Sequence, residues 1–283
     1  MLWAFGINLV MLAAAIAGGI VFNSVALLGE AGHVANDMAA IGLGIFAARI
    51  AARPPAGRRT FGYRRVEVVA ALVNGLLLVA VAIWIAVESI SRLSDPVPVE
   101  GAGVLAIGIV ELIGNGLGVW VLARGDRSNL NLEGVLRHSA ADALGAIGVV
   151  IAGAIVLTTG WEQADPILGL AIAVLILVGS WRLIREPFDV LLEAAPEGID
   201  VQEVGREMCR VLGVREVHDL HIWTVTSGFP ALAAHVRADP GEDVDSVRER
   251  VESMLDERFA IGHTTLQVMP ERLLELEDRR RRR

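Results

Sequence analysis

Long apolar stretches alternate with short polar links from the first residues of the chain to about residue 190. Six of these stretches are close to the ~20 residues that a helix needs to cross a bilayer. A soluble protein can also bury apolar helices, but six in succession with such short links are typical of a membrane domain. The sequence therefore predicts membrane-spanning helices at Leu2–Phe22, Leu27–Ile50, Val66–Ile90, Val99–Ala123, Gly134–Thr158 and Pro166–Ile184.

The pattern changes after about residue 196. Residues 199–212 have the spacing of a helix, and residues 214–227 and 229–239 alternate like two strands. An amphipathic helix at 243–259 and a third alternating strand at 263–269 follow. This order predicts a small α+β domain. We expect a membrane domain at residues 1–190, an α+β domain at 191–275 and an arginine-rich tail at 276–283.

Composition supports this division and narrows the function. Hydrophobic residues make up 54% of the chain, too many for an ordinary soluble protein of this size. The net charge of −8 arises largely in the C-terminal part, so no nucleic-acid partner is expected. Cys209 is the one cysteine, which excludes an internal disulfide and a CxxC metal site. The first apolar stretch is followed by further spans, so we expect no cleaved signal peptide.

The arginines predict the orientation. Six lie in the link between the second and third spans, and more lie between the fourth and fifth and after the sixth, whereas the other links hold only Arg92. Positive residues favour the cytoplasmic side. Both termini are therefore expected in the cytoplasm, with the chain in the inner or plasma membrane. The tail, Arg279–Arg283, is interpreted as a solvated end, with binding to anionic lipid headgroups as the alternative.

Two pairs of ionisable residues interrupt this apolar sequence. His33 and Asp37 lie one helical turn apart in the second span, and His138 and Asp142 have the same spacing in the fifth. An ionisable group in hydrocarbon costs at least ~2.5–3.5 kcal/mol, so it needs a reason to be there. If the two helices meet, the pairs supply two imidazole nitrogens and two carboxylate oxygens, a complete tetrahedral set for Zn²⁺.

Charge balance favours a metal site over the alternative, a pair of structural hydrogen bonds between helices. Two carboxylates neutralise one divalent cation in a medium where bare charge is costly. Without the ion the carboxylates would favour protons, so metal binding would release protons. Alternation between metal and protons is the chemistry of an antiporter.

Glu111, Asn115 and Glu30 are further polar residues at membrane depth. Glu111 and Asn115, one turn apart in the fourth span, are interpreted as hydrogen-bonding to a neighbouring helix, with a place in the metal cavity as the alternative. Glu30 lies a turn before His33, where it either attracts cations at an entrance or reaches the membrane interface.

Several motifs resemble the cation diffusion facilitator family. They are NSVALLGEAGHVANDMAA, FGYRRVEVVAALVNGLLL, LRHSAADALGAIGVV and HDLHIWTVTSGFPALAAHV, in the family's order and spacing over nearly the whole chain. The resemblance implies six helices, a cytoplasmic metallochaperone-like (ferredoxin-like) domain, a homodimer, and export of divalent metal against protons. It places His33, Asp37, His138 and Asp142 on the transport site.

The resemblance and the ligand chemistry agree on the cargo. Members with histidine in both pairs resemble zinc transporters, and imidazole suits Zn²⁺, Co²⁺ and Ni²⁺ better than Mn²⁺. Zn²⁺ is therefore the expected transported ion, with Cd²⁺ and Co²⁺ as alternatives. The link PPAGRRTFGYRR is rich in arginine and lacks acidic and histidine residues ahead of FG, so the extra metal site that some members have there is not expected.

The resemblance also implies a regulatory metal site in the α+β domain, formed by His218, His235 and His263. His221 is three residues from His218, so in a regular strand the two face opposite sides. Met269 replaces the acidic residue that usually ends the last strand, which weakens this site, and a plain surface role is the alternative. The family also pairs charges at the positions of Arg65 and Glu193, which would matter only if buried.

Two other functions are weighed. An intramembrane hydrolase would use Asp37 and Asp142 or a bound zinc, but the sequence has neither an HExxH nor a GxGD motif, and four ligands would leave no position for water. A metal-sensing scaffold would bind zinc in the soluble domain and use the spans as an anchor. The sequence therefore predicts a transporter, not an enzyme.

Overall fold

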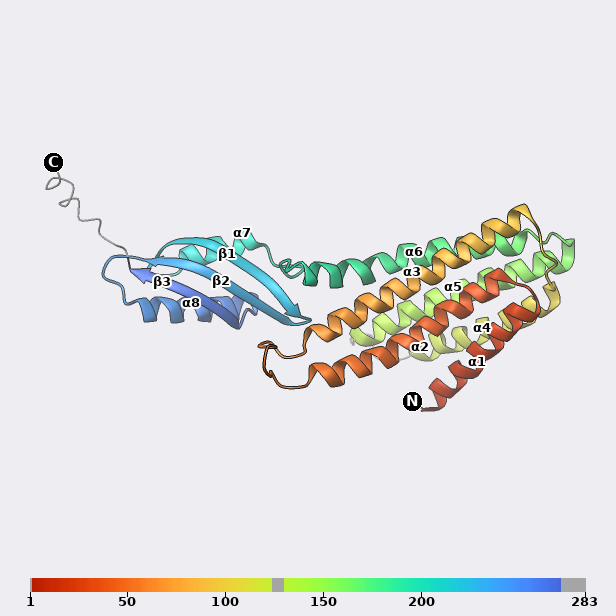
Figure 1. Cartoon of the computed structure of the whole chain (residues 1–283), viewed down its shortest axis with the longest axis horizontal. Coiled ribbons are helices and arrows are strands. Elements are labelled where there is room, and N and C mark those ends of the chain that lie inside the picture. The colour runs from red at the N-terminus through yellow and green to blue at the C-terminus, as the bar shows by residue number, and fades with distance from the viewer. Residues whose placement is uncertain (1, 124–129, 271–283) are drawn as a thin grey trace. The chain divides into compact units, whose positions relative to one another are not determined.

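The computed structural model describes residues 2–123 and 130–270 (Figure 1). The side chains of residues 2–8, 121–122, 130–135, 137–139 and 141 are not described, and the arginine-rich tail lies outside the described residues. The chain divides into two compact units. One comprises Met1–Phe46 and Ala71–Ile184, and the other Ala47–Ala70 and Arg185–Arg283.

The first unit is a bundle of helices that run alongside one another (Figure 1). Five are long and apolar enough to cross a membrane, and the segment Leu9–Val21 of α1 is apolar but shorter. The predicted class, six helices followed by a small α+β domain, is confirmed. The helices are α1 (Leu2–Val21), α2 (Val25–Ala51), α3 (Arg65–Ser94), α4 (Gly101–Leu122), α5 (Leu130–Thr159) and α6 (Ala164–Leu191).

Helix α6 is longer than the apolar pattern predicts. The predicted span ends at Ile184, where polar residues begin, but the helix continues through Pro187 to Leu191. Hydrophobicity marks the part of a helix that lipid can cover, whereas the backbone hydrogen bonds continue beyond it. The last turns of α6 belong to the second unit.

Small residues let the helices of the bundle approach closely. Gly153 on α5 lies against the backbone of α4, where an added Cβ would come within 2.6 Å of the Leu105 nitrogen. Gly101 on α4 makes a matching approach to Leu157. Close backbone contact is the usual way in which helices associate in lipid. Buried aliphatic side chains from the neighbouring helices, among them Leu27, Ile85 and Val149, form the core.

Three interhelical turns meet at one end of the bundle. The Glu100 amide donates to Phe22 O, and the Arg92 guanidinium donates to Asn23 O. Asp165, at the start of α6, is fully buried and accepts hydrogen bonds from Ser24 Oγ at 2.5 Å and from the Val25 amide at 2.7 Å. Its carboxylate thereby satisfies a donor in the first turn of α2. Helices α2, α4 and α6 begin at this end, and α5 finishes there.

The second unit contains a three-stranded sheet flanked by α7 and α8 (Figure 1). Strand β2 lies in the middle, antiparallel to β1 and parallel to β3. Asp243 caps α8, and its hydrogen bonds from the Ser246 amide and hydroxyl lower the pKa of that carboxyl. The elements are α7 (Val201–Arg210), β1 (Val214–Thr226), β2 (Phe229–Ala238), α8 (Val244–Phe259) and β3 (His263–Pro270).

The core of this unit lies between one face of the sheet and both helices. Leu232, Ala234 and Val236 alternate along β2 and pack in one cluster with Met208 of α7 and Leu255 of α8. The residues between them on β2, including His235, therefore face the other side of the sheet. This alternation explains why the strands could be predicted from sequence.

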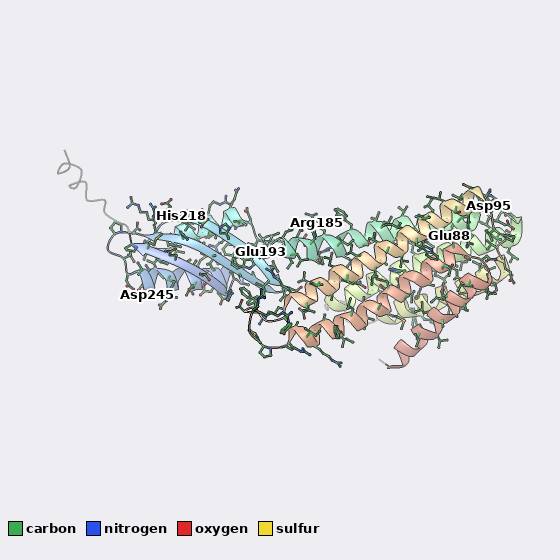
Figure 2. All side chains as sticks on the ribbon, in the orientation of Figure 1. Glu88, Asp95, Arg185, Glu193, His218 and Asp245 are labelled. Carbon is green, nitrogen blue, oxygen red and sulfur yellow. The ribbon has the colours of Figure 1, made fainter. Side chains whose placement is uncertain are left out.

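The end of α2, the link that follows it and the first residues of α3, which include Arg65 and Glu67, also belong to the second unit. The Thr226 hydroxyl donates to Glu67 Oε2 at 3.1 Å, and Arg65 pairs with Glu193 at 3.1 Å. Figure 2 labels Glu193, which follows the end of α6. The Arg65 and Glu193 side chains are 41% and 63% exposed. This pair therefore contributes at most ~1 kcal/mol, as is usual for an exposed ion pair.

We predict that Asp165→Ala destabilises the bundle. The substitution leaves the Ser24 hydroxyl and the Val25 amide without their buried acceptor, which costs about 1–3 kcal/mol. Thermal unfolding of the purified protein in detergent should show a lower melting temperature. Asp95→Ala, which changes an exposed carboxylate in the α3–α4 link, is the control and should leave the melting temperature unchanged. Equal melting temperatures for both variants would contradict the capping role.

Candidate metal centre

Three of the predicted ligands come together between α2 and α5. His33 Nε2 lies 3.6 Å from Asp37 Oδ2, one turn along the same helix, and 3.4 Å from Asp142 Oδ1 on α5. One ligand atom from each of the three residues lies within 4.8 Å of the others. The side chains are only 16–29% exposed. Among the side chains that the structure describes, this is the one such group of histidine, cysteine or acidic residues.

The spacing of these atoms suits a tetrahedral ion. Bonds of about 2.0 Å in a tetrahedron place neighbouring ligand atoms about 3.3 Å apart. The two distances from His33 Nε2, 3.4 and 3.6 Å, are close to that value. One nitrogen and two carboxylate oxygens also balance the charge of a divalent cation. A bound divalent ion would neutralise these two partly buried carboxylates.

His138, the fourth predicted ligand, lies on α5 four residues before Asp142. Its side chain lies outside the described residues. The helical repeat places it on the same face of α5 as Asp142, at the position that His33 has relative to Asp37.

For Glu30 and Glu111 the sequence allowed two alternative roles each, and their burial bears on the choice. Glu30 is 3% exposed and Glu111 is 6% exposed, so neither reaches the edge of the unit. Both line a small cavity together with Asn115. Glu111 Oε2 has no hydrogen-bond partner among the described residues. Glu111 was predicted to hydrogen-bond to a neighbouring helix, and this oxygen makes no such bond to the described residues.

The predicted regulatory ligands are only partly brought together. His218 on β1 and His235 on β2 are directly opposite in the antiparallel pair, and their ring centroids are 5.1 Å apart. Figure 2 labels His218 on the sheet. Since His235 points away from the helices, both rings lie on the face of the sheet opposite α7 and α8. Two of the three predicted ligands, His218 and His235, are therefore neighbours on the sheet.

His263 lies elsewhere on the sheet. In the parallel β2–β3 pair it is opposite Ala231, whereas His235 is opposite Gln267. Four residues at about 3.3 Å each separate the two positions by about 13 Å. The His263 ring instead lies near the rings of Phe61 and Phe229, with centroid distances of 5.7 and 5.4 Å. Within one chain the expected three-histidine group is therefore not assembled. In this respect the prediction was wrong, because the register between the strands could not be read from the sequence.

Asp219 is a residue that the sequence reasoning missed. Its carboxylate lies 3.1 Å from His221 Nε2 and 3.9 Å from His235 Nε2. Asp219 has φ +55°, and the β1–β2 register shifts between His218 and His221. This irregularity breaks the strict alternation on which the prediction about His221 depended. The dipeptide His218-Asp219 was the available signal, but a strand bulge cannot be read from it.

Comparison with known proteins identifies the family. Residues 1–192 match the cation efflux transmembrane domain, and residues 196–271 match the cytoplasmic domain of cation efflux proteins. The chain belongs to the cation diffusion facilitator (cation efflux) family. The resemblance noted in the sequence motifs is thereby confirmed.

Individual relatives cover most of both chains. The chain is 38% identical to the zinc transporter ZitB of Escherichia coli K12 over 270 residues, 95% of this chain and 86% of that protein. It is 34% identical to a cadmium, cobalt and zinc/H(+)-K(+) antiporter of Bacillus subtilis, over 90% of this chain and 83% of that protein. Identity to the metal cation efflux system protein CzcD of Cupriavidus metallidurans is 36%, with 90% and 81% covered.

One solved structure is also similar. It is described as the metal-bound C-terminal domain of the CzcD transporter, and its sequence is 36% identical to the matched part of this chain. The match covers 25% of this chain and 99% of that structure, with a TM-score of 0.24.

These relatives decide between the classes of function. They are cation efflux transporters and not enzymes, so the alternative of an intramembrane hydrolase is set aside. The chain is a membrane protein with several spans, and its relatives transport zinc, cadmium and cobalt.

We predict that Asp37→Ala weakens zinc binding by more than about 10-fold. The substitution removes one carboxylate from the group and leaves the ion's charge half balanced, and even changes beside a metal ligand cost 10–100-fold in affinity. Titration of the purified full chain with Zn²⁺ against a chromophoric chelator measures the change. Asp189→Ala, an exposed carboxylate near the end of α6, should leave every affinity unchanged. Identical titrations for Asp37→Ala and the parent would contradict the ligand role.

Proposed function

We propose that this protein exports divalent metal cations, Zn²⁺ foremost, from the cytoplasm in exchange for protons. The observation that carries the proposal is the approach of His33, Asp37 and Asp142, which come from two helices and are 16–29% exposed. His138, one helical turn before Asp142 in the sequence of α5, is proposed as the fourth ligand. The names of the relatives support the same cargo, because they include zinc, cadmium and cobalt transporters.

Proton exchange follows from the same ligands. A carboxylate or imidazole must lose its proton before it binds a metal ion. Loading the site therefore releases protons, and protons that return from the other side displace the ion. The printed name of the Bacillus subtilis relative, an antiporter that includes H⁺, supports this coupling. The site would be exposed to one side of the membrane at a time by alternating access.

The remaining parts of the proposal concern assembly and location. The arginine distribution supports cytoplasmic termini in the inner or plasma membrane. We place the membrane domain at residues 1–190 and the cytoplasmic domain at 191–275. We expect a homodimer, because the family model that matches the cytoplasmic domain is named for a dimer. His218, His235 and Asp219 are proposed as a regulatory metal site; within one chain His263 is too distant to join them.

Asp142→Ala should abolish zinc-driven proton flux. The variant removes the α5 carboxylate that approaches His33, so neither the ion nor its exchanged proton is held. Reconstituted proteoliposomes that contain a pH-sensitive dye measure the flux after zinc is added. The variant should still purify as a folded protein of unchanged size. Zinc-driven proton flux at the parent rate would show that the site lies elsewhere.

The cargo can be ranked by competition. Zn²⁺, Co²⁺ and Cd²⁺ should compete for uptake into inverted membrane vesicles, whereas Mn²⁺ should compete poorly because it favours oxygen over imidazole ligands. Uptake of radioactive zinc with each unlabelled ion in tenfold excess measures the order. Strong competition by Mn²⁺ would contradict a site that contains two histidines.

A further inference from the structure

A second polar group lies close to the metal centre. Glu30 on α2 and Glu111 on α4 are 3% and 6% exposed, and together with Asn115 they line a cavity of about 30 Å³. The other lining residues are Met11, Leu12, Ala15 and Val34, so no basic side chain lines this cavity in the described part of the chain. A space of this size admits a water molecule or a dehydrated metal ion.

The unpartnered oxygens argue against a purely structural role. Glu30 Oε1 and Glu111 Oε2 have no hydrogen-bond partner among the backbone and side-chain atoms that the structure describes. Carboxyl groups that only tie helices together would have these atoms satisfied, since nearly all buried polar atoms in proteins are paired. Two carboxyl groups that share one cavity cannot easily both be ionised unless a cation lies between them, and otherwise they hold protons. The pair can therefore be neutralised either by protons or by a divalent cation.

The group lies one helical turn from the metal centre on two helices. Glu30 precedes His33 by three residues on α2. On α5, Gly145 follows Asp142 by three residues, and a Cβ added there would come within 2.3 Å of Glu30 Oε2. Glycine at 145 thus makes room for this carboxylate. Because α2 begins and α5 finishes at the same end of the bundle, both offsets point toward that end.

That end is the one at which the turns around Asn23, Glu100 and Asp165 meet. The predicted orientation places it on the side away from the cytoplasm. An ion that leaves the His33–Asp37–Asp142 group in the export direction moves toward it. The Glu30–Glu111 group is therefore in position to receive an outgoing ion.

We propose that Glu30, Glu111 and Asn115 form a second divalent-cation site that accepts the metal ion after it leaves the His33–Asp37–Asp142 group. Two carboxylates and an amide oxygen balance a divalent charge, as at the first site. An oxygen-only set holds zinc less tightly than one that includes imidazole, so transfer brings the ion closer to release. This inference rests on the proposed transport function.

The test measures zinc binding and zinc transport on the same full-length variants. Equilibrium dialysis of the purified chain against Zn²⁺ gives the number of bound ions and their affinities. Glu111→Gln should remove or weaken by at least tenfold one weak class of bound zinc, and it should leave the class that Asp37→Ala weakens unchanged. Zinc flux by Glu111→Gln in proteoliposomes should fall at least tenfold.

Two further variants separate a site from a folding effect. Gly145→Ala displaces the Glu30 carboxylate without removing a charge, and it should weaken the same class of bound zinc. Glu88→Gln is the matched control, because Glu88 on α3 pairs with Arg92 at 2.8 Å and should bind no zinc (Figure 2). If Glu111→Gln does not purify as a monodisperse protein, Asn115→Leu removes a proposed oxygen ligand and carries the same test.

The outcomes are distinguishable. Unchanged zinc stoichiometry and affinities in folded Glu111→Gln and Gly145→Ala overturn the second site, even if Asp142→Ala abolishes flux. A changed proton-to-zinc ratio with unchanged zinc binding also overturns it and assigns the pair to protons alone. If Asp142→Ala retains full flux, the proposed function fails first, whatever the binding data for Glu111→Gln show.

Discussion

The cost of placing a carboxylate in hydrocarbon constrains the whole membrane unit. Asp37 and Asp142 approach His33 from two helices, and in the proposed function one divalent ion or its exchanged protons balances both charges. This convergence requires α2 and α5 to lie close together in a fixed register. The close packing of neighbouring helices at small residues, such as Gly153 against α4, makes a bundle that can hold that register.

The same constraint extends outward from the centre. Glu30 and Glu111 are buried more deeply than the three ligands, yet no described basic side chain lines their cavity. By contrast, Asp165 at the end of the bundle is satisfied by a hydroxyl and a backbone amide. Buried carboxyl groups in this unit are thus of two kinds: the hydrogen bonds of one are completed by the protein itself, and the other keeps oxygens without a described partner. The transport function proposed above draws on the second kind.

The second unit obeys the ordinary rules of a two-layer α+β domain. One face of its sheet is buried by α7 and α8, which leaves His218 and His235 on the other face. The link between α2 and α3 contributes Phe61 to a contact with the start of β3, and the first turn of α3 contributes Glu67 to a contact with the end of β1. A segment between two membrane helices is therefore part of this unit's packing, which sequence patterns did not suggest.

The sequence by itself determined the elements and half of the site. Apolar length is set by bilayer thickness, and the pairing of His33 with Asp37 is set by the helical repeat, so both are local properties. Only the tertiary structure decided which distant residues meet. It brought Asp142 close to His33 and placed Glu30 and Glu111 around one cavity. In the second unit it brought Asp219 close to His235 through a strand bulge and placed His263 beside Phe61. Interhelical rotation and strand register depend on packing between segments, and no spacing within a single segment encodes them.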